Sequence, residues 1–177
     1  MMIGFTGRRS VGKSEAAKVL IAGGFVPVHA LGGGRAAAEA YLVHIGASKS
    51  EAHEMVYGAL KDVPCDLLPG NAKPRDFLEP FGNWWGTKMG PEWTLGAELR
   101  RIKRDLPFAS IVVESLVYEA DLFRAAGGRI VRITRPGTAG PAGMMTDAAE
   151  ATIVADAEIV NDGSLEDLAR AVGALIP

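Results

Sequence analysis

The sequence contains little that could form a covalent or metal-based scaffold. It has a single cysteine, Cys65, and three histidines among 177 residues. One thiol cannot form an intramolecular disulfide, and no base lies near Cys65 in the sequence, so we assign it a structural role. His29, His44 and His53 do not follow the spacing of metal ligands. A lone cysteine is typical of a reducing compartment, and we expect a cytoplasmic protein.

Two further absences narrow the class of protein. No apolar run approaches the roughly 18 to 20 residues that span a bilayer, and the first residues lack the pattern of a secretory signal peptide. The formal net charge is -2, which argues against a broad electrostatic surface for nucleic acid. We therefore expect neither a membrane nor a nucleic acid as partner. The sequence does not fix the oligomeric state, so a homodimer stays open.

Short apolar runs alternate with helix-forming segments along most of the chain. Strands are predicted at 2–6, 25–30, 108–114, 129–134 and 157–160. Helices are predicted at 13–22, at 35–61 in two pieces, at 92–105, at 119–126 and after Ser164. Capping boxes are predicted for Ser48 with Glu51 and for Ser164 with Asp167. One face of the last helix is predicted to carry Leu165, Leu168, Val172, Leu175 and Ile176. Pro27 suggests an edge strand. This order predicts an α/β fold in which helices cover both faces of a parallel sheet of about five strands.

Two segments depart from the alternation. Residues 30–105 are predicted to form a helical insertion, and prolines interrupt 62–92. Residues 135–156 begin with a loop-like composition and are predicted to form a short lid. We expect residues 1–177 to form a single domain with this insertion, since 48% of them are apolar and provide one core.

The strongest motif is GRRSVGKS at residues 7–14, which lies between the first predicted strand and the first predicted helix. This is the pattern of a phosphate-binding loop. The two glycines permit backbone angles that let N–H groups turn toward phosphate oxygens. The ammonium group of Lys13 is predicted to reach the β- and γ-phosphates of ATP, and the hydroxyl of Ser14 to hold Mg²⁺. The predicted nucleotide contacts are Gly7, Arg8, Arg9, Ser10, Val11, Gly12, Lys13, Ser14 and Glu15.

Other candidates carry weaker signals. Glu114 follows a buried strand at the edge of the sheet where the phosphates are expected, so its carboxylate is a candidate Mg²⁺ ligand. Arg8 and Arg9 either contact phosphates or are solvated. Arg135 is a candidate lid arginine, and the alternative is a strand-end residue in water. Asn161 lies in a turn that could border the ATP base through backbone groups, and a plain tight turn explains it nearly as well.

A phosphate-binding loop does not name the reaction, because hydrolases, switches, motors and kinases share it. Four stretches of this chain resemble the deoxynucleoside monophosphate kinases of bacteriophages. They are IGFTGRRSVGKSEAA near the N-terminus and the segments 73–100, 111–137 and 147–172. The resemblance implies a fold of the P-loop NTPase type and a helical insertion, 30–105, that binds the acceptor. It also implies ATP and Mg²⁺ as cofactors and a (deoxy)nucleoside monophosphate as acceptor substrate.

The same resemblance implies residues on the acceptor side. Arg75 matches an arginine of the family and is predicted to bind the acceptor phosphate, where its alternative is a surface arginine at a helix start. Trp93 matches a tryptophan that could stack on a base, and its alternative is packing. Arg100 is the member of the cluster 100–104 that we expect to contact phosphate. Lys13, Arg75 and Arg135 are thus the predicted catalytic cations.

The chain also departs from the family pattern. An arginine is usual shortly after the third-stretch strand, whereas Glu114 is followed by Ser115, Leu116 and Val117. Asp147 and Ala149 stand where the family has histidine and serine, and Glu150 is retained. Two alternatives to a nucleoside monophosphate kinase therefore stay open. One is another small-molecule kinase, similar to dephospho-coenzyme A kinase, and the other is a nucleotide-binding module without transfer activity.

Overall fold

The computed structural model describes residues 1–138 and 149–176, which divide into two compact units. Unit 1 comprises Met1–Ala30 and Leu95–Pro177, and unit 2 comprises Leu31–Thr94. The helical insertion was predicted at 30–105, whereas unit 2 ends at Thr94, so residues 95–105 belong to unit 1. None of the helices in the described residues is both long and apolar enough to cross a bilayer.

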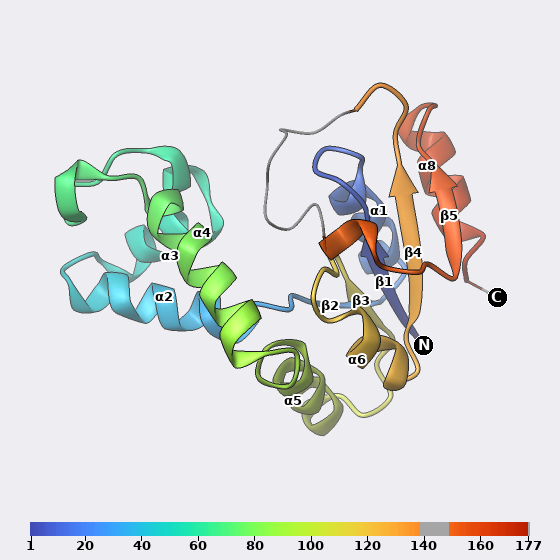
Figure 1. Cartoon of the computed structure of the whole chain (residues 1–177), viewed down its shortest axis with the longest axis horizontal. Coiled ribbons are helices and arrows are strands. Elements are labelled where there is room, and N and C mark those ends of the chain that lie inside the picture. Colours follow the sequence, from blue (N-terminus) through green and yellow to red (C-terminus); the bar gives the residue numbers. More distant parts are fainter. Residues whose placement is uncertain (139–148, 177) are drawn as a thin grey trace. The chain divides into compact units, whose positions relative to one another are not determined.

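A five-stranded, fully parallel sheet forms the centre of unit 1, as predicted (Figure 1). Its strands lie in the order β2-β3-β1-β4-β5. Their bounds are Met2–Thr6 for β1, Val26–Val28 for β2, Ile111–Val113 for β3, Arg129–Thr134 for β4 and Ala157–Val160 for β5. The edge position of β2 confirms the expectation from Pro27, whose missing N–H would interrupt an inner strand.

Alternate residues of the inner strands face two separate hydrophobic cores. The first core joins Ile3 and Phe5 of β1 to helices α1 (Lys13–Ala22) and α8 (Leu165–Gly173). The second core joins Ile111 and Val113 of β3 to helices α5 (Ala97–Asp105) and α6 (Ala120–Ala125). Helices therefore cover both faces of the sheet, which is why the inner strands carry buried apolar residues on both faces.

Helix α8 begins where the sequence predicted. The Ser164 hydroxyl accepts a hydrogen bond from the Asp167 N–H, and the Asp167 carboxylate accepts one from the Ser164 N–H, so the capping box is confirmed. Leu168 and Val172 are buried against the sheet. Leu165 was predicted to share their face, but it is 64% exposed because it lies at the first position of the helix.

Unit 2 is helical. Its elements are α2 (Gly32–His44), α3 (Lys49–Tyr57), the short helices η1 (Ala59–Asp62) and η2 (Pro69–Asn71), and α4 (Pro74–Trp84). Two π-helical turns follow, η3 at Trp85–Met89 and η4 at Glu92–Gly96. The capping box of Ser48 and Glu51 starts α3, as predicted. A core that includes Leu42, Met55 and Val56 holds the helices together.

Helix α4 is the main difference from the sequence-based expectation. The prolines at 62–92 indicated broken structure, yet Pro74 occupies the first helical turn and Pro80 lies within the helix. Pro74 is compatible with a helix start, because its absent N–H would have no partner there. Phe77 and Phe81 stack on one another with ring centroids 5.6 Å apart. We infer that this packing offsets the hydrogen bond that Pro80 cannot make.

The segment 92–105 also differs from the single predicted helix. It starts as the π-helical turn η4 and continues as α5, which belongs to unit 1. Leu99 and Ile102 of α5 are buried in the second core of the sheet. The apolar spacing of α5 thus serves the sheet and not the core of the helical insertion.

Phe123 provides a test of this core. Its side chain is 0% exposed beside Leu116, whereas that of Phe108 is 98% exposed in the loop before β3. We expect Phe123→Ala to lower the free energy of unfolding by about 3–5 kcal/mol, because it removes a buried ring and leaves a cavity. The matched control, Phe108→Ala, should change it by less than about 0.5 kcal/mol. Urea titration followed by circular dichroism measures both, and similar losses for the two variants would contradict the assigned core.

Candidate functional site

The loop between β1 and α1 follows a path that requires glycine at two positions. Gly7, Ser10 and Gly12 have positive φ angles of 134, 63 and 105°. A Cβ atom at Gly7 would lie 2.2 Å from the backbone oxygen of Ile133, and one at Gly12 would lie 2.5 Å from Nδ2 of Asn161. Any larger residue at either glycine would therefore displace the loop, as the predicted phosphate-binding motif requires.

Asn161 fixes the far side of the loop. Its Nδ2 atom donates a hydrogen bond of 2.8 Å to the backbone oxygen of Val11, and its own N–H donates one of 2.8 Å to Thr134. Asn161 is buried, and so is the Val11 side chain. The sequence assigned Asn161 to the border of the ATP base, and that contact stays a prediction. Its side chain holds the loop in shape.

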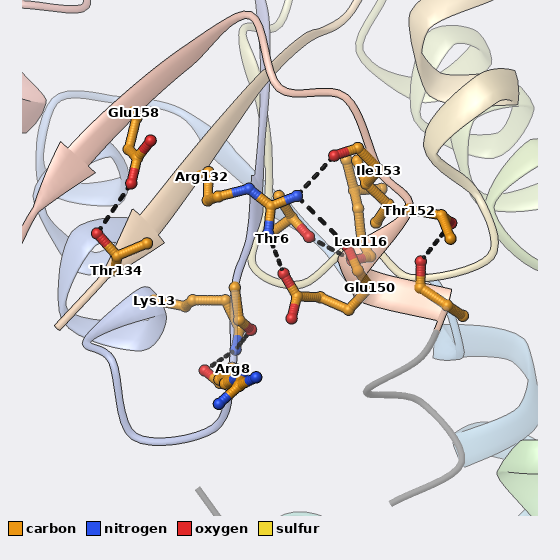
Figure 2. Close-up of polar contacts among 12 residues, drawn as sticks. Thr6, Arg8, Lys13, Leu116, Arg132, Thr134, Glu150, Thr152, Ile153 and Glu158 are labelled. Atoms are coloured by element: carbon orange, nitrogen blue, oxygen red, sulfur yellow. Dashed lines mark hydrogen bonds and ion pairs between the residues drawn. The ribbon is translucent and has the colours of Figure 1, made fainter. Parts of the chain in front are cut away.

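Lys13 lies at the start of α1 and curls back over the loop. Its Nζ atom donates hydrogen bonds of 2.5 Å to the backbone oxygen of Gly7 and 2.8 Å to that of Arg8 (Figure 2). Burial lowers the pKa of Lys13 below its ordinary value, while the carboxylates of Glu150 and Glu114 act in the opposite direction. The ammonium group thus already lies at the loop and interacts with two neighbouring acids.

Ser14 and Glu114 come together although they are 100 residues apart. The hydroxyl of Ser14, in the first turn of α1, donates a short hydrogen bond to Oε1 of Glu114, directly after β3. Both groups offer hard oxygen atoms, which Mg²⁺ prefers, so the pair fits the predicted metal ligands. Within residues 1–138 and 149–176 there is no cluster of three His, Cys, Asp or Glu side chains suited to a metal. A bound Mg²⁺ would therefore take further oxygen ligands from phosphate and water.

The backbone N–H group of Glu15, and not its carboxylate, is available to contact a nucleotide. Its carboxylate pairs with Lys18 at 2.7 Å on the exposed surface of α1. The N–H groups of Lys13, Ser14 and Glu15 belong to the first turn of the helix, where no intrahelical acceptor precedes them. They can therefore donate to an anion, and the positive end of the helix dipole favours the same position.

A pocket of about 350 Å³ adjoins the loop. It is lined by the loop, by the carboxyl end of β4 and by residues after the undescribed segment 139–148. Three arginines contribute to the lining, Arg8, Arg132 and Arg135, together with the carboxylate of Glu150. The pocket therefore carries a strong positive charge beside the phosphate-binding loop, which suits a polyphosphate. Arg135, the predicted lid arginine, is one of the residues that line this pocket.

Arg132 and Glu150 form a buried ion pair that the sequence analysis did not identify. Nη1 of Arg132 lies 2.5 Å from Oε1 of Glu150, and Nη2 donates a hydrogen bond of 2.6 Å to the backbone oxygen of Ile153 (Figure 2). The side chains are only 21% and 9% exposed. A charged residue between the apolar Val131 and Ile133 of the strand segment RIVRIT is the signal that could have found this arginine.

The predicted acceptor-side residues are divided between the units. Arg75 belongs to unit 2, where its Nε and Nη2 atoms donate to Asp62 at 2.5 and 2.8 Å and its Nη1 lies 3.5 Å from Glu79. The bond to Asp62 raises the pKa of Arg75 above its ordinary value. Arg75 thus ties η1 to α4, and its predicted contact with an acceptor phosphate stays a prediction.

Two more predicted residues have exposed side chains. Trp93 is 65% exposed in unit 2. Arg100 lies on α5 of unit 1. Its neighbours on that helix pair locally, since Arg101 contacts Glu98 and Arg104 contacts Asp105. Much of the predicted lid, 135–156, including Asp147, lies outside the described residues.

Among known proteins, several solved structures are similar to this chain in fold. No protein-family model matches the chain, and no curated protein does. Among solved structures, a dephospho-CoA kinase from Campylobacter jejuni is 17% identical, with 99% of this chain and 95% of that chain covered and a TM-score of 0.48. A protein from Thermus thermophilus is 19% identical, with coverages of 99% and 96% and a TM-score of 0.46. A sugar kinase from a Janibacter species is 15% identical, with coverages of 98% and 93% and a TM-score of 0.44. At such values we base the function on the geometry of the site.

Proposed function

We propose that the protein transfers the γ-phosphoryl group of ATP to a small acceptor, and that the acceptor is a (deoxy)nucleoside monophosphate. The observation that carries this proposal is the convergence of Lys13 on the loop with the contact between Ser14 and Glu114. Three features therefore lie together: the ammonium group of Lys13, the start of α1, and the oxygen atoms of Ser14 and Glu114. This is the set of groups that phosphoryl transfer from ATP requires.

Lys13 is suited to follow the phosphates. Its present acceptors are the neutral backbone oxygens of Gly7 and Arg8. Phosphate oxygens carry charge and form stronger hydrogen bonds with an ammonium group than backbone carbonyl groups do. The polyphosphate would therefore replace these carbonyl oxygens as the partner of Lys13 without a change in the path of the loop.

Ser14 and Glu114 are the residues that would hold Mg²⁺, Glu114 directly or through a water molecule. When bound, Mg²⁺ supplies positive charge that neutralises the β- and γ-phosphate oxygens. The described residues contribute the remaining charge, mainly through Lys13 and the pocket-lining Arg8 and Arg135.

Catalysis would then depend on position and charge, with no covalent intermediate on the protein. The acceptor is proposed to bind the segment 73–104, with Arg75 contacting its phosphate and Trp93 stacking on its base. Arg75 would have to exchange contacts with Asp62 or Glu79 for the phosphate, because all three of its guanidinium nitrogens now face carboxylates.

An acceptor panel tests the proposal and its two alternatives. We expect labelled ATP to yield a nucleoside diphosphate with one of the ribo- or deoxyribonucleoside monophosphates, and no product with inorganic phosphate as acceptor. Phosphorylation of dephospho-coenzyme A instead would support the related small-molecule kinase. ATP binding with transfer to none of these acceptors would support the nucleotide-binding module. Failure to bind ATP, measured by calorimetry, would reject all three.

Lys13 can be tested against a lysine of the same helix. We expect Lys13→Ala to lower kcat/KM by roughly 100-fold or more, because it removes a cation aimed at the transferring group. Lys18→Ala should change kcat/KM by less than about twofold, since Lys18 is exposed and pairs only with Glu15. Equal effects of the two substitutions, with both variants folded by circular dichroism, would contradict the role of Lys13.

Glu114 can be tested through the metal dependence of ATP binding. We expect the wild type to bind ATP more tightly with Mg²⁺ than with EDTA. Glu114→Gln should reduce that difference by about tenfold, because a metal-site carboxylate is removed while the hydrogen bond from Ser14 can persist. Calorimetric titrations measure both affinities. Glu158→Gln on β5 is the control, and an unchanged metal dependence in Glu114→Gln would exclude Glu114 from the site.

A further inference from the structure

The ion pair of Arg132 and Glu150 lies in the pocket beside the phosphate-binding loop and has no role in the function proposed above. Glu150 is the only acid among the described residues that line this pocket, where it meets the cations Arg8, Arg132 and Arg135. Its carboxylate also interacts electrostatically with Lys13. One buried carboxylate therefore offsets the charge of cations that an arriving polyphosphate would need.

Arg132 is held in place by more than this carboxylate. Its Nη2 atom donates to the backbone oxygen of Ile153 at 2.6 Å and lies 3.4 Å from that of Glu150 (Figure 2). Its backbone belongs to the inner strand β4, which pairs with β1 and β5. The guanidinium group would thus stay in the pocket if the negative charge of Glu150 were removed.

We propose that Glu150 is a resident counter-ion of the phosphate pocket, which balances Arg132 and Lys13 until a polyphosphate replaces it as their partner. Glu150 would then limit the affinity for polyphosphate, and the protein would bind it more tightly without that charge. This inference rests on the proposed function only in that the loop binds a polyphosphate. It does not depend on which acceptor is used or on transfer itself.

The alternative is that Glu150 serves only to hold Arg132 as a ligand of the polyphosphate. The two roles predict opposite effects. A counter-ion competes with the polyphosphate, so its loss strengthens binding, whereas loss of a support displaces Arg132 and weakens binding. Glu150→Gln separates them, because it removes the charge while a glutamine keeps nearly the same shape and an oxygen that can accept the hydrogen bond from Nη1 of Arg132. The counter-ion role then predicts tighter binding, whereas the support role predicts equal or weaker binding.

The test measures the affinity of the full chain for inorganic tripolyphosphate and for ATP in EDTA by calorimetry. We expect Glu150→Gln to bind both about tenfold more tightly than the wild type, because one negative charge no longer repels the polyanion at short range. Glu98→Gln is the matched control. Glu98 likewise accepts hydrogen bonds from an arginine and is 13% exposed, but it lies on α5 and does not line the pocket. It should leave both affinities within about twofold of the wild type.

Arg132 completes the test. We expect Arg132→Gln to weaken tripolyphosphate binding at least about tenfold, since Glu150 then faces the phosphates without its partner. The double variant Arg132→Gln, Glu150→Gln should return to within about threefold of the wild type, because the charge balance is restored. If Arg132 served only as a ligand, the double variant would stay as weak as Arg132→Gln.

Each result has a defined meaning. Equal or weaker binding by Glu150→Gln, or a double variant as weak as Arg132→Gln, would overturn the counter-ion role. If Glu150→Gln does not fold, the comparison of the double variant with Arg132→Gln decides the question alone. A wild type that binds neither tripolyphosphate nor ATP would reject the proposed function instead, so the two failures are distinguishable.

Discussion

Two close contacts of the loop backbone, at Gly7 and at Gly12, determine the shape of the site. The loop approaches the backbone of β4 at Gly7 and the Asn161 side chain at Gly12, and at neither place is there room for a methyl group. The hydrogen bond from Asn161 to Val11 then fixes the segment between the glycines. Because the loop has one path, the N–H groups at the start of α1 and the side chain of Lys13 converge in the absence of any anion. In the proposed phosphoryl transfer, such preorganisation would remove a cost of reorganisation.

Local patterns in the sequence were sufficient to predict the parallel sheet and the loop at residues 7–14. The strands at 129–134 and 157–160 have the predicted bounds, and both capping boxes form as predicted, because each depends on residues within one turn or one strand. Helix α4 could not be predicted in this way. Prolines favour a break, and the stacking of Phe77 on Phe81 that accompanies the helix cannot be read from the chain without its three-dimensional packing.

The site shows the same division between local and long-range information. The contact of Ser14 with Glu114 could be anticipated, since the carboxyl ends of parallel strands meet at one edge of the sheet. The contacts of Arg75 with Asp62 and of Arg132 with Glu150 could not. Helical spacing favours the pair of Arg75 with Glu79, but it selects neither Asp62 after α3 nor Glu150 beyond the undescribed segment.

Lys13 of the loop and Arg132 of the adjoining pocket have physically different partners. Lys13 donates to uncharged backbone oxygens, which a phosphate can replace at little cost, whereas Arg132 faces a buried carboxylate and two further backbone oxygens. Removing a buried carboxylate from its partner is unfavourable unless another anion takes its place. In the proposed transfer, Lys13 is therefore the cation that would follow a moving phosphoryl group. Under the counter-ion proposal, Arg132 would supply a fixed positive charge that Glu150 balances until a polyphosphate binds.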